Sequence, residues 1–403
     1  MTTPWMDIIR GAWQRLPVGA VLPILTALPA LAFLLPGWAG CGHPPGGVAD
    51  AGLDAAPACP HYDAVIDSPV PVRIEGLEDV VDVAAGWEHH CAVSGSGEVY
   101  CWGSNCLGAL GDGTTTDSAT PVLVAGLPPA ERVVVPRGGW WVSCALTVDK
   151  EVWCWGQGYE GFDKAPKHVY DLRSIMDIDI GAFHICALDV NGILQCWGSN
   201  SSGRLGIGED APLFFTSPVE PNGGHRFLSV YCSSFHTCAI TTEGSFLCWG
   251  DTPETEYPGY RVVPEPVDNV PPITGFYPGF YHDCLIDMEA NVWCWGYNDF
   301  GQVGSGETGL GELRTRFVQH PYVVDASQVA PGAFSTCALL QDGTVSCWGD
   351  DNHGQRGDGE SNDELGNTPS QVVDLEDVVR ISAGAFLVCA ITADGALWCW
   401  GQG

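Results

Sequence analysis

The stretch Cys389-Ala-Ile-Thr-Ala-Asp-Gly-Ala-Leu-Trp-Cys-Trp-Gly401 decides the fold of this protein. Two short runs of strand-forming residues flank an Asp-Gly pair, which is typical of a β-hairpin turn. If the turn is a three-residue loop with Gly395 left-handed, counting back along both strands places Cys389 directly opposite Cys399. Alternation then makes the cysteines a non-hydrogen-bonded pair, with Cα atoms about 4.5 Å apart and within disulfide reach. The sequence therefore predicts a disulfide-bonded hairpin.

The same pattern of Cys, nine residues and Cys-Trp-Gly occurs seven times without a change in spacing. We predict one disulfide in each hairpin. The pairs are Cys91 with Cys101, Cys144 with Cys154, Cys186 with Cys196, Cys238 with Cys248, Cys284 with Cys294, Cys337 with Cys347, and Cys389 with Cys399. Metal ligation by these cysteines is the alternative, but it would require cysteines clustered at short spacings.

The first cysteines of successive copies lie 42 to 53 residues apart, which leaves room for two further strands in each copy. Four short strands in a repeat of about 50 residues are typical of one blade of a β-propeller. The last copy ends at Gly403 without its outer strand, and a matching strand-like segment occurs at Ser68–Arg73. We predict an all-β, seven-bladed propeller over residues 61–403, in which this N-terminal strand joins the C-terminal hairpin and closes the ring.

The segments Trp102-Gly-Ser-Asn105 and Gly108-Ala-Leu-Gly-Asp-Gly113, followed by Pro121-Val and a Gly-x-x-His-x-Cys-Ala element, resemble the repeat of the regulator of chromosome condensation family. The resemblance covers about residues 65–403 and implies the same seven-bladed fold. The copies that begin at Cys144 and Cys238 lack the Asn and Gly-rich loop, so we expect altered loops in those blades. A secreted bacterial member of this fold, a β-lactamase-inhibiting propeller, grips a protein with one face. The resemblance therefore favours protein binding.

Composition and charge narrow the compartment and the partners. The 403 residues include 16 Lys+Arg against 49 Asp+Glu, for a net charge of -33. Such a chain repels phosphate backbones, so nucleic acid is not an expected partner. For the same reason we do not expect the function of the family's founding member, which is nucleotide exchange beside chromatin. The 18 cysteines favour an oxidising compartment.

The N-terminus agrees with export. Arg10 and Arg15 precede the apolar segment 18–36, and Ala39-Gly-Cys41 resembles the lipobox of bacterial lipoproteins. We predict a lipoprotein signal peptide over residues 1–40, lipidation of Cys41, and a flexible tether over residues 41–60. The protein would then be anchored by lipid at the bacterial cell envelope, at the outer membrane or cell surface. A plain cleaved signal and a retained anchor are the alternatives. Cys59, Cys106 and Cys232 remain unassigned.

Six of the seven copies carry an aromatic residue three positions before the first hairpin cysteine, and Glu88 occupies this position in the remaining copy. The aromatic residues are Trp141, Phe183, Phe235, Tyr281, Phe334 and Phe386. Repetition should arrange them in one ring, and exposed aromatic residues on a rigid face are common anchors of protein interfaces. We predict that they bind a protein partner; the alternative is that they only pack between blades.

Other repeated residues have structural interpretations. His89, His184, His236 and His282 stand two positions before their cysteines, and we expect each to bond a neighbouring backbone group rather than a metal. The tryptophans of the seven Cys-Trp-Gly elements should pack blade on blade. The acidic segment 358–364 is interpreted as a solvated loop, with calcium binding as the alternative.

These features predict a monomeric, non-catalytic, surface-tethered propeller that binds a protein through one face, with no metal or cofactor. No Gly-x-Ser-x-Gly elbow, phosphate loop or metalloprotease motif is present in the sequence. The alternatives are an enzyme propeller, a polysaccharide lyase or hydrolase acting on envelope polymers, and a secreted inhibitor of a hydrolase.

Overall fold

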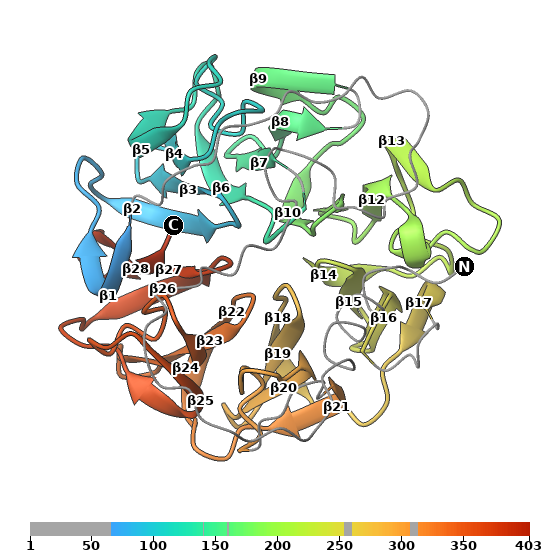
Figure 1. Cartoon of the computed structure of the whole chain (residues 1–403). Helices are drawn as coiled ribbons and strands as arrows, with labels where there is room; N and C mark the ends of the chain where they lie inside the picture. The colour runs from blue at the N-terminus through green and yellow to red at the C-terminus, as the bar shows by residue number, and fades with distance from the viewer. Residues whose placement is uncertain (1–65, 140, 159–160, 254–259, 307–312) are drawn as a thin grey trace, which may run out of the picture. The chain divides into compact units, whose positions relative to one another are not determined.

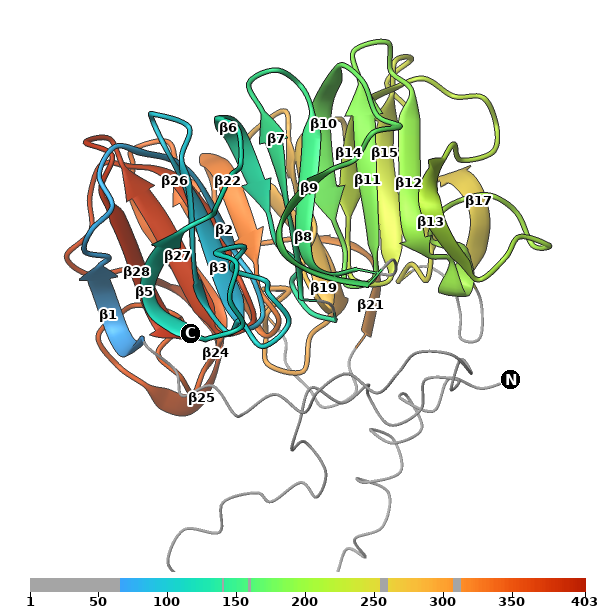
Figure 2. The same cartoon turned by 90° about the horizontal axis from the view of Figure 1, so that it is seen from above.

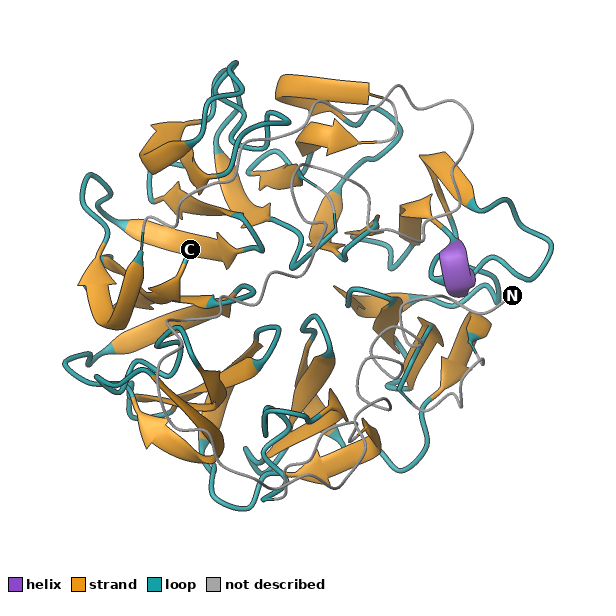
Figure 3. Cartoon of the chain, viewed as in Figure 1, coloured by secondary structure: helices purple, strands orange, loops and turns teal. Residues whose placement is uncertain are grey.

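The computed structural model describes residues 66–139, 141–158, 161–253, 260–306 and 313–403. Within these ranges the chain is all-β, with seven four-stranded antiparallel sheets and one short 3-10 turn, η1 (Ser201–Gly203). The sheets are arranged around a central axis, as Figure 1 and Figure 3 show. The predicted seven-bladed β-propeller is therefore confirmed.

Blades 1 to 6 follow one another along the chain, each running from an innermost to an outermost strand. They are blade 1, β2 (Val80–Ala85), β3 (His89–Ser94), β4 (Val99–Gly103), β5 (Ser118–Leu123); blade 2, β6 (Ala130–Val134), β7 (Val142–Thr147), β8 (Val152–Gly158), β9 (Gly161–His168); blade 3, β10 (Ile175–Ile180), β11 (His184–Asp189), β12 (Leu194–Ser199), β13 (Phe214–Val219); blade 4, β14 (Phe227–Cys232), β15 (His236–Thr241), β16 (Phe246–Gly250), β17 (Arg261–Pro266); blade 5, β18 (Ile273–Tyr277), β19 (His282–Asp287), β20 (Val292–Tyr297), β21 (Leu313–Gln319); blade 6, β22 (Ala326–Pro331), β23 (Ser335–Leu340), β24 (Val345–Asp351), β25 (Asn362–Gln371).

Blade 7 is built from both ends of the propeller. It consists of β26 (Val378–Ala383), β27 (Leu387–Thr392), β28 (Leu397–Gln402) and the N-terminal strand β1 (Asp67–Arg73). β1 pairs antiparallel with β28, and Ile66 and Gly403 exchange two backbone hydrogen bonds of 3.0 Å each. As predicted, the N-terminal strand supplies the outermost strand of the last blade and so closes the ring.

Each hairpin has the predicted register. In blade 7, Cys389 pairs with Cys399, and the turn is closed by hydrogen bonds from Thr392 N–H to Ala396 O (3.0 Å) and from Gly395 N–H to Thr392 O (2.8 Å). All seven hairpins carry a disulfide with Cα atoms 4.1 Å apart. The close separation agrees with the non-hydrogen-bonded pairing deduced from the turn.

The hydrophobic core is divided among the interfaces between blades. The cluster between blades 1 and 2, for example, joins Val93, Val99 and Leu110 to Val133 and Trp155. Seven such clusters occur in the described part of the chain, each shared by neighbouring sheets. A single blade cannot bury both faces, so the ring is the unit that folds.

One of the two altered loops is visible in blade 2. There β8 and β9 pair as far as Gly158 and Gly161, so the ladder continues where other blades have a long loop. The altered loop predicted for this blade is therefore confirmed. In blade 4, residues 254–259 of the corresponding connection lie outside the described ranges.

The N-terminal predictions concern residues that the structure does not describe. The predicted signal peptide at 1–40, the lipidation site Cys41, the tether at 41–60 and Cys59 all fall before residue 66. Cys106 is disulfide-bonded, and Cys232 is a free, buried cysteine. Among the described residues, no helix has the length and apolar character needed to cross a membrane.

Candidate protein-binding face

The six predicted aromatic residues and Glu88 occupy the same place in all seven blades. Each stands directly before the second strand of its blade, in the loop that follows the innermost strand. Because neighbouring strands are antiparallel, these loops lie at the same end of the ring as the connections from the third to the fourth strand. The side view in Figure 2 shows the two ends of the ring. We call the end that carries Glu88 and the six aromatic residues the aromatic face.

A backbone hydrogen bond of the same kind fixes each of these loops. The carbonyl of the aromatic residue, or of Glu88, accepts the N–H of the residue after the Trp-Gly pair in the third strand. The bond measures 3.0 Å from Tyr297 to Tyr281 and 2.8 Å from Ser199 to Phe183. Gly296 has φ of 111°, and a Cβ there would lie 2.6 Å from the Tyr281 carbonyl oxygen. The glycine of Trp-Gly is therefore needed to hold the aromatic loop.

The aromatic side chains of blades 4 to 7 pack against one another. Ring centroids are 5.3 Å apart between Tyr281 and Phe334, and 5.7 Å apart between Phe334 and Phe386. Contacts of this kind between neighbouring rings contribute about 0.5 to 1.5 kcal/mol each beyond the area they bury. All the rings remain half-buried. They therefore link adjacent blades and also present part of their surface to solvent.

Two aromatic residues that the sequence analysis did not single out complete this cluster. Trp87 of blade 1 and Phe280 of blade 5 have ring centroids 4.8 Å apart, although their blades are not adjacent. Phe280 also contacts Phe235 (5.7 Å) and Tyr281 (4.3 Å), and Trp87 lies 6.1 Å from Phe386. Their place directly before Glu88 and Tyr281 was the available signal. The pair therefore joins two blades that are not neighbours in the ring.

Blades 1 to 3 contribute a more polar arc to the same face. The indole N–H of Trp141 donates to the Glu88 carboxylate at 2.9 Å, which links blades 2 and 1. The guanidinium of Arg204 lies over the Phe183 ring at 5.5 Å. The six predicted residues thus lie on one face, in an apolar arc and a polar arc; their role in binding a partner stays a prediction.

Ionisable groups near the apolar arc are shifted toward their neutral forms. Burial and the neighbouring Tyr297 raise the pKa of Tyr281 to about 12. Burial also raises the pKa of Asp251 and of Asp350, which follow the Trp-Gly pairs of blades 4 and 6.

The repeated histidines serve the interfaces between blades, but not in the way the sequence suggested. Their Nε2 atoms contact side chains of the next blade instead of backbone groups, because a hydroxyl or carboxyl precedes the next first cysteine. The contacts are His89 to Ser143 Oγ (2.9 Å), His184 to Thr237 Oγ1 (2.7 Å), His282 to Thr336 Oγ1 (2.6 Å) and His236 to the Asp283 carboxylate (3.1 Å). The predicted backbone partner was wrong.

The tryptophans of the Cys-Trp-Gly elements pack blade on blade, as predicted. Trp155 of blade 2 donates its indole N–H to the Ala109 carbonyl in the Gly-rich loop of blade 1, at 2.8 Å. Six of the seven are buried, and Trp197 of blade 3 is half-buried. The blade that precedes Trp197 is blade 2, in which the β8–β9 ladder replaces the long loop. Trp197 therefore lacks the loop that covers Trp155.

The acidic segment 358–364 departs from a simple solvated loop. The Asp358 carboxylate lies 3.4 Å from Arg356 Nε and accepts the backbone N–H of Glu360 at 3.1 Å. From Asn362 onward the chain belongs to strand β25. Part of the segment is therefore strand, and one of its carboxylates has a cationic partner.

Part of this chain matches a known repeat family. Models of the regulator of chromosome condensation (RCC1) repeat match residues 80–109, 176–204, 227–252, 326–355 and 378–403, and residues 96–146. The matched segments fall in blades 1, 2, 3, 4, 6 and 7. The fold is a seven-bladed propeller, and these segments are similar to RCC1 repeats, as the resemblance implied.

The chain is also similar to curated relatives in sequence and to solved structures in fold. The chain is 27% identical over 352 residues to the ultraviolet-B receptor UVR8 of Arabidopsis thaliana, covering 80% of this chain and 77% of the receptor. It is 30% identical over 336 residues to the human E3 ubiquitin-protein ligase HERC2, covering 76% of this chain and only 7% of the ligase. The crystal structure of Prp20p from Saccharomyces cerevisiae matches with a TM-score of 0.66 at 21% identity, covering 80% of this chain and 82% of Prp20p. That of human WBSCR16 matches with a TM-score of 0.68 at 18% identity, covering 82% of this chain and 88% of WBSCR16.

Proposed function

We propose that this protein is a non-catalytic, monomeric propeller that binds a protein partner through the aromatic face, and that it is exported and held at the cell envelope by a lipid on Cys41. The observation that supports binding most directly is the continuous, half-buried cluster running from Trp87 and Phe280 through Tyr281 and Phe334 to Phe386. A rigid aromatic surface loses little conformational entropy when a partner covers it.

The related structures favour the same type of function. The yeast Prp20p structure was described together with its binding properties to Gsp1p and histones, and Prp20 was also crystallised with Kap60. These partners belong to Prp20p. What we carry over to this chain is the use of the RCC1-type propeller as a rigid platform for another protein.

Site-specific crosslinking would test the binding face. A photoreactive phenylalanine analogue at Phe183 or Phe334 should crosslink a partner in the native host. The same analogue at Tyr170, which is 79% exposed in the connection after β9 at the opposite end of the ring, is the matched control. Partner capture should also be lost in the triple variant Phe183→Ala, Phe235→Ala and Phe334→Ala. Equal crosslinking from Tyr170, or unchanged capture by the triple variant, would reject this face.

The anchor is tested separately. A Cys41→Ser variant should be released from the membrane fraction while its propeller still binds the partner. A variant that remains in the membrane fraction would contradict anchoring by a lipid at Cys41.

A further inference from the structure

The interface between blades 3 and 4 holds a free thiol where other blades have none. Cys232 ends the innermost strand of blade 4 and pairs with Thr237. The register places Ala85, Ile180, Pro331 and Ala383 at this position in blades 1, 3, 6 and 7. Cys232 is 1% exposed, and it is the one free cysteine among the residues that the structure describes. Its thiol is therefore not needed by the repeat itself.

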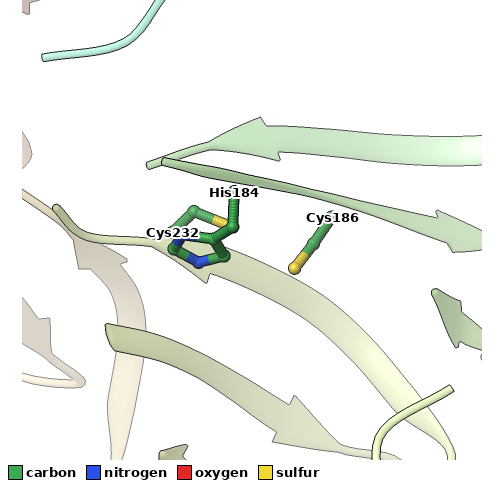
Figure 4. Close-up of side chains that lie close together, drawn as sticks. All are labelled: His184, Cys186 and Cys232. Atoms are coloured by element: carbon green, nitrogen blue, oxygen red, sulfur yellow. The ribbon is translucent and has the colours of Figure 1, made fainter. Parts of the chain in front are cut away.

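A histidine of the neighbouring blade lies beside this thiol. A ring nitrogen of His184 and the sulfur atoms of Cys186 and Cys232 all lie within 4.8 Å of one another, and Figure 4 shows the three side chains. Cys186 is bonded to Cys196, so its sulfur offers no thiolate. The two groups that remain available as ligands are the imidazole of His184 and the thiol of Cys232.

The hydrogen bonds around His184 determine which of its nitrogens is free. Thr237 Oγ1 donates its one proton to the Arg204 carbonyl at 2.8 Å, so at its 2.7 Å contact with His184 it accepts the proton of Nε2. Nδ1 then carries an unshared electron pair, and it has no hydrogen-bond partner although His184 is completely buried. Burial lowers the pKa of His184 well below its ordinary value of 6.5, so the ring is neutral.

We propose that His184 Nδ1 and Cys232 Sγ form a binding site for a soft monovalent cation, Cu(I). Thiolate ligands favour Cu(I), and a two-donor set suits its low coordination numbers, whereas Zn²⁺ is normally held by four ligands in structural sites. A histidine ligand whose other N–H donates to a neighbouring acceptor is the usual arrangement in metal sites, and Thr237 provides that acceptor here.

Binding must remove the proton from the Cys232 thiol. The S–H bond breaks and the proton leaves to solvent, while sulfur and Nδ1 each form a bond to the metal, so no electrons are transferred. Burial raises the pKa of Cys232 well above its ordinary value, and nearby Asp179 adds to this shift. Asp179 Oδ2 also accepts the Cys232 backbone N–H at 2.7 Å. Because binding releases the thiol proton, the apparent affinity for Cu(I) should increase with pH.

Competition for Cu(I) tests the site. The full chain in a Cys41→Ser background, with its disulfides intact, should withdraw one Cu(I) per chain from its complex with bicinchoninate under anaerobic conditions. Cys232→Ala should withdraw none, and it should fold, because Ala85 and Ala383 occupy the equivalent position in two other blades. Unchanged stoichiometry in Cys232→Ala, or no uptake by the parent chain, would overturn the proposal.

The equivalent histidine of blade 5, His282, serves as a control that separates copper binding from the structural role of the repeated histidine. His282 has the same kind of Nε2 contact, to Thr336, and the same unpartnered Nδ1, but Pro331 stands where Cys232 does. His282→Gln should leave Cu(I) uptake unchanged, and His184→Gln should abolish it. Thr237→Val should weaken affinity by about 10- to 100-fold, because it removes the acceptor that orients His184. X-ray absorption at the copper edge should show one sulfur and one nitrogen ligand; sulfur ligands alone would contradict the role of His184.

Discussion

The interfaces between blades 1 and 2 and between blades 4 and 5 both provide an acceptor for a buried tryptophan indole N–H, but they use different groups to do so. In the first, the Ala109 carbonyl of the Gly-rich loop accepts both the Trp155 indole N–H (2.8 Å) and the Ser143 hydroxyl (2.9 Å), and Ser143 contacts His89. Blade 4 lacks the sequence of that loop. There Asp283, at the position equivalent to Ser143, accepts the Trp295 indole N–H at 2.8 Å and lies 3.1 Å from His236 Nε2.

The comparison shows that a buried carboxylate can replace a hydroxyl and a loop carbonyl together. Asp283 also accepts the Gly279 N–H at 3.1 Å, and Phe317 stacks on Trp295 with ring centroids 4.2 Å apart. Burial alone would raise the pKa of Asp283, but the nearby His236 and these hydrogen bonds lower it instead. The interface between blades 4 and 5 therefore depends on the charged Asp283 carboxylate, whereas the interface between blades 1 and 2 uses neutral groups at the equivalent place.

Removing each of the two central side chains should have unequal effects. Asp283→Ala leaves buried donors without an acceptor and should lower the free energy of unfolding by about 3 to 5 kcal/mol. Ser143→Ala should lower it by about 1 to 2 kcal/mol, because the Ala109 carbonyl still accepts from Trp155 and only the Nε2–H of the neutral His89 loses its acceptor. Urea unfolding followed by tryptophan fluorescence, with disulfides intact, would measure both. Equal losses would show that the carboxylate has no special role.

The Gly-rich loop can be tested within blade 1. Gly111 has φ of 66°, and a Cβ there would lie 2.7 Å from Trp155 Nε1; Gly113 has φ of 87° and open space around it. Gly111→Ala should therefore lower the free energy of unfolding by about 3 kcal/mol, from backbone strain and overpacking together. Gly113→Ala should cost about 1 kcal/mol from strain alone. Thermal unfolding of the two variants would check the difference, and similar melting temperatures would contradict packing of the loop on Trp155.

The disulfides should not distinguish the two kinds of interface. Removing the Cys144–Cys154 or the Cys284–Cys294 bridge by double alanine substitution should lower the free energy of unfolding by at most about 2 to 3 kcal/mol, because each closes an equally short loop. Both bridges span a sequence separation of 10 with Cα atoms 4.1 Å apart. Chemical unfolding of the two double variants would measure the losses. A clearly larger loss in blade 5 would mean that its bridge also supports the Asp283 network.

Acidification should destabilise the interfaces in which a buried histidine contacts a hydroxyl group of the next blade. Burial lowers the pKa of His89 to about 4 from 6.5, so the unfolded chain takes up a proton that the folded chain does not as pH falls from 6.5 toward 4. Linkage predicts a loss of about 2 kcal/mol between pH 7 and pH 5 from this residue. Asp283, with its lowered pKa, contributes stability above the ordinary aspartate pKa of about 3.9 and loses it only below that pH. Urea midpoints at pH 7 and 5 should therefore differ less in His89→Gln than in the parent chain; an equal difference would contradict the assignment.

Much of the fold could be predicted because its determinants are local and repeated. The Asp-Gly turn determines the hairpin register, so Cys389 could be placed opposite Cys399, and the missing outer strand could be located at Ser68–Arg73. The residues of the aromatic face could be listed for the same reason, since one position recurs in each copy. Trp87 and Phe280 could not be predicted to meet, because their contact joins blades 1 and 5 and no spacing records it.

Departures from the repeat were harder to interpret. The loss of the Gly-rich loop in blade 4 was visible in the sequence, but its replacement by Asp283 of the next blade was not. The same holds for Cys232, which the sequence left unassigned and which gains a neighbour only when β14 packs against β11.

By itself the sequence determined the unit: a short disulfide-bonded hairpin, repeated seven times, with its fourth strand supplied across the ends of the chain. Those features depend on backbone hydrogen bonds and cysteine spacing within a few residues, which a linear pattern records. Only the tertiary structure decided which side chains meet between neighbouring blades and between blades 1 and 5. Those contacts depend on how curved sheets pack around an axis, and the pairing of Cys232 with His184 and of Trp87 with Phe280 follows from that packing alone.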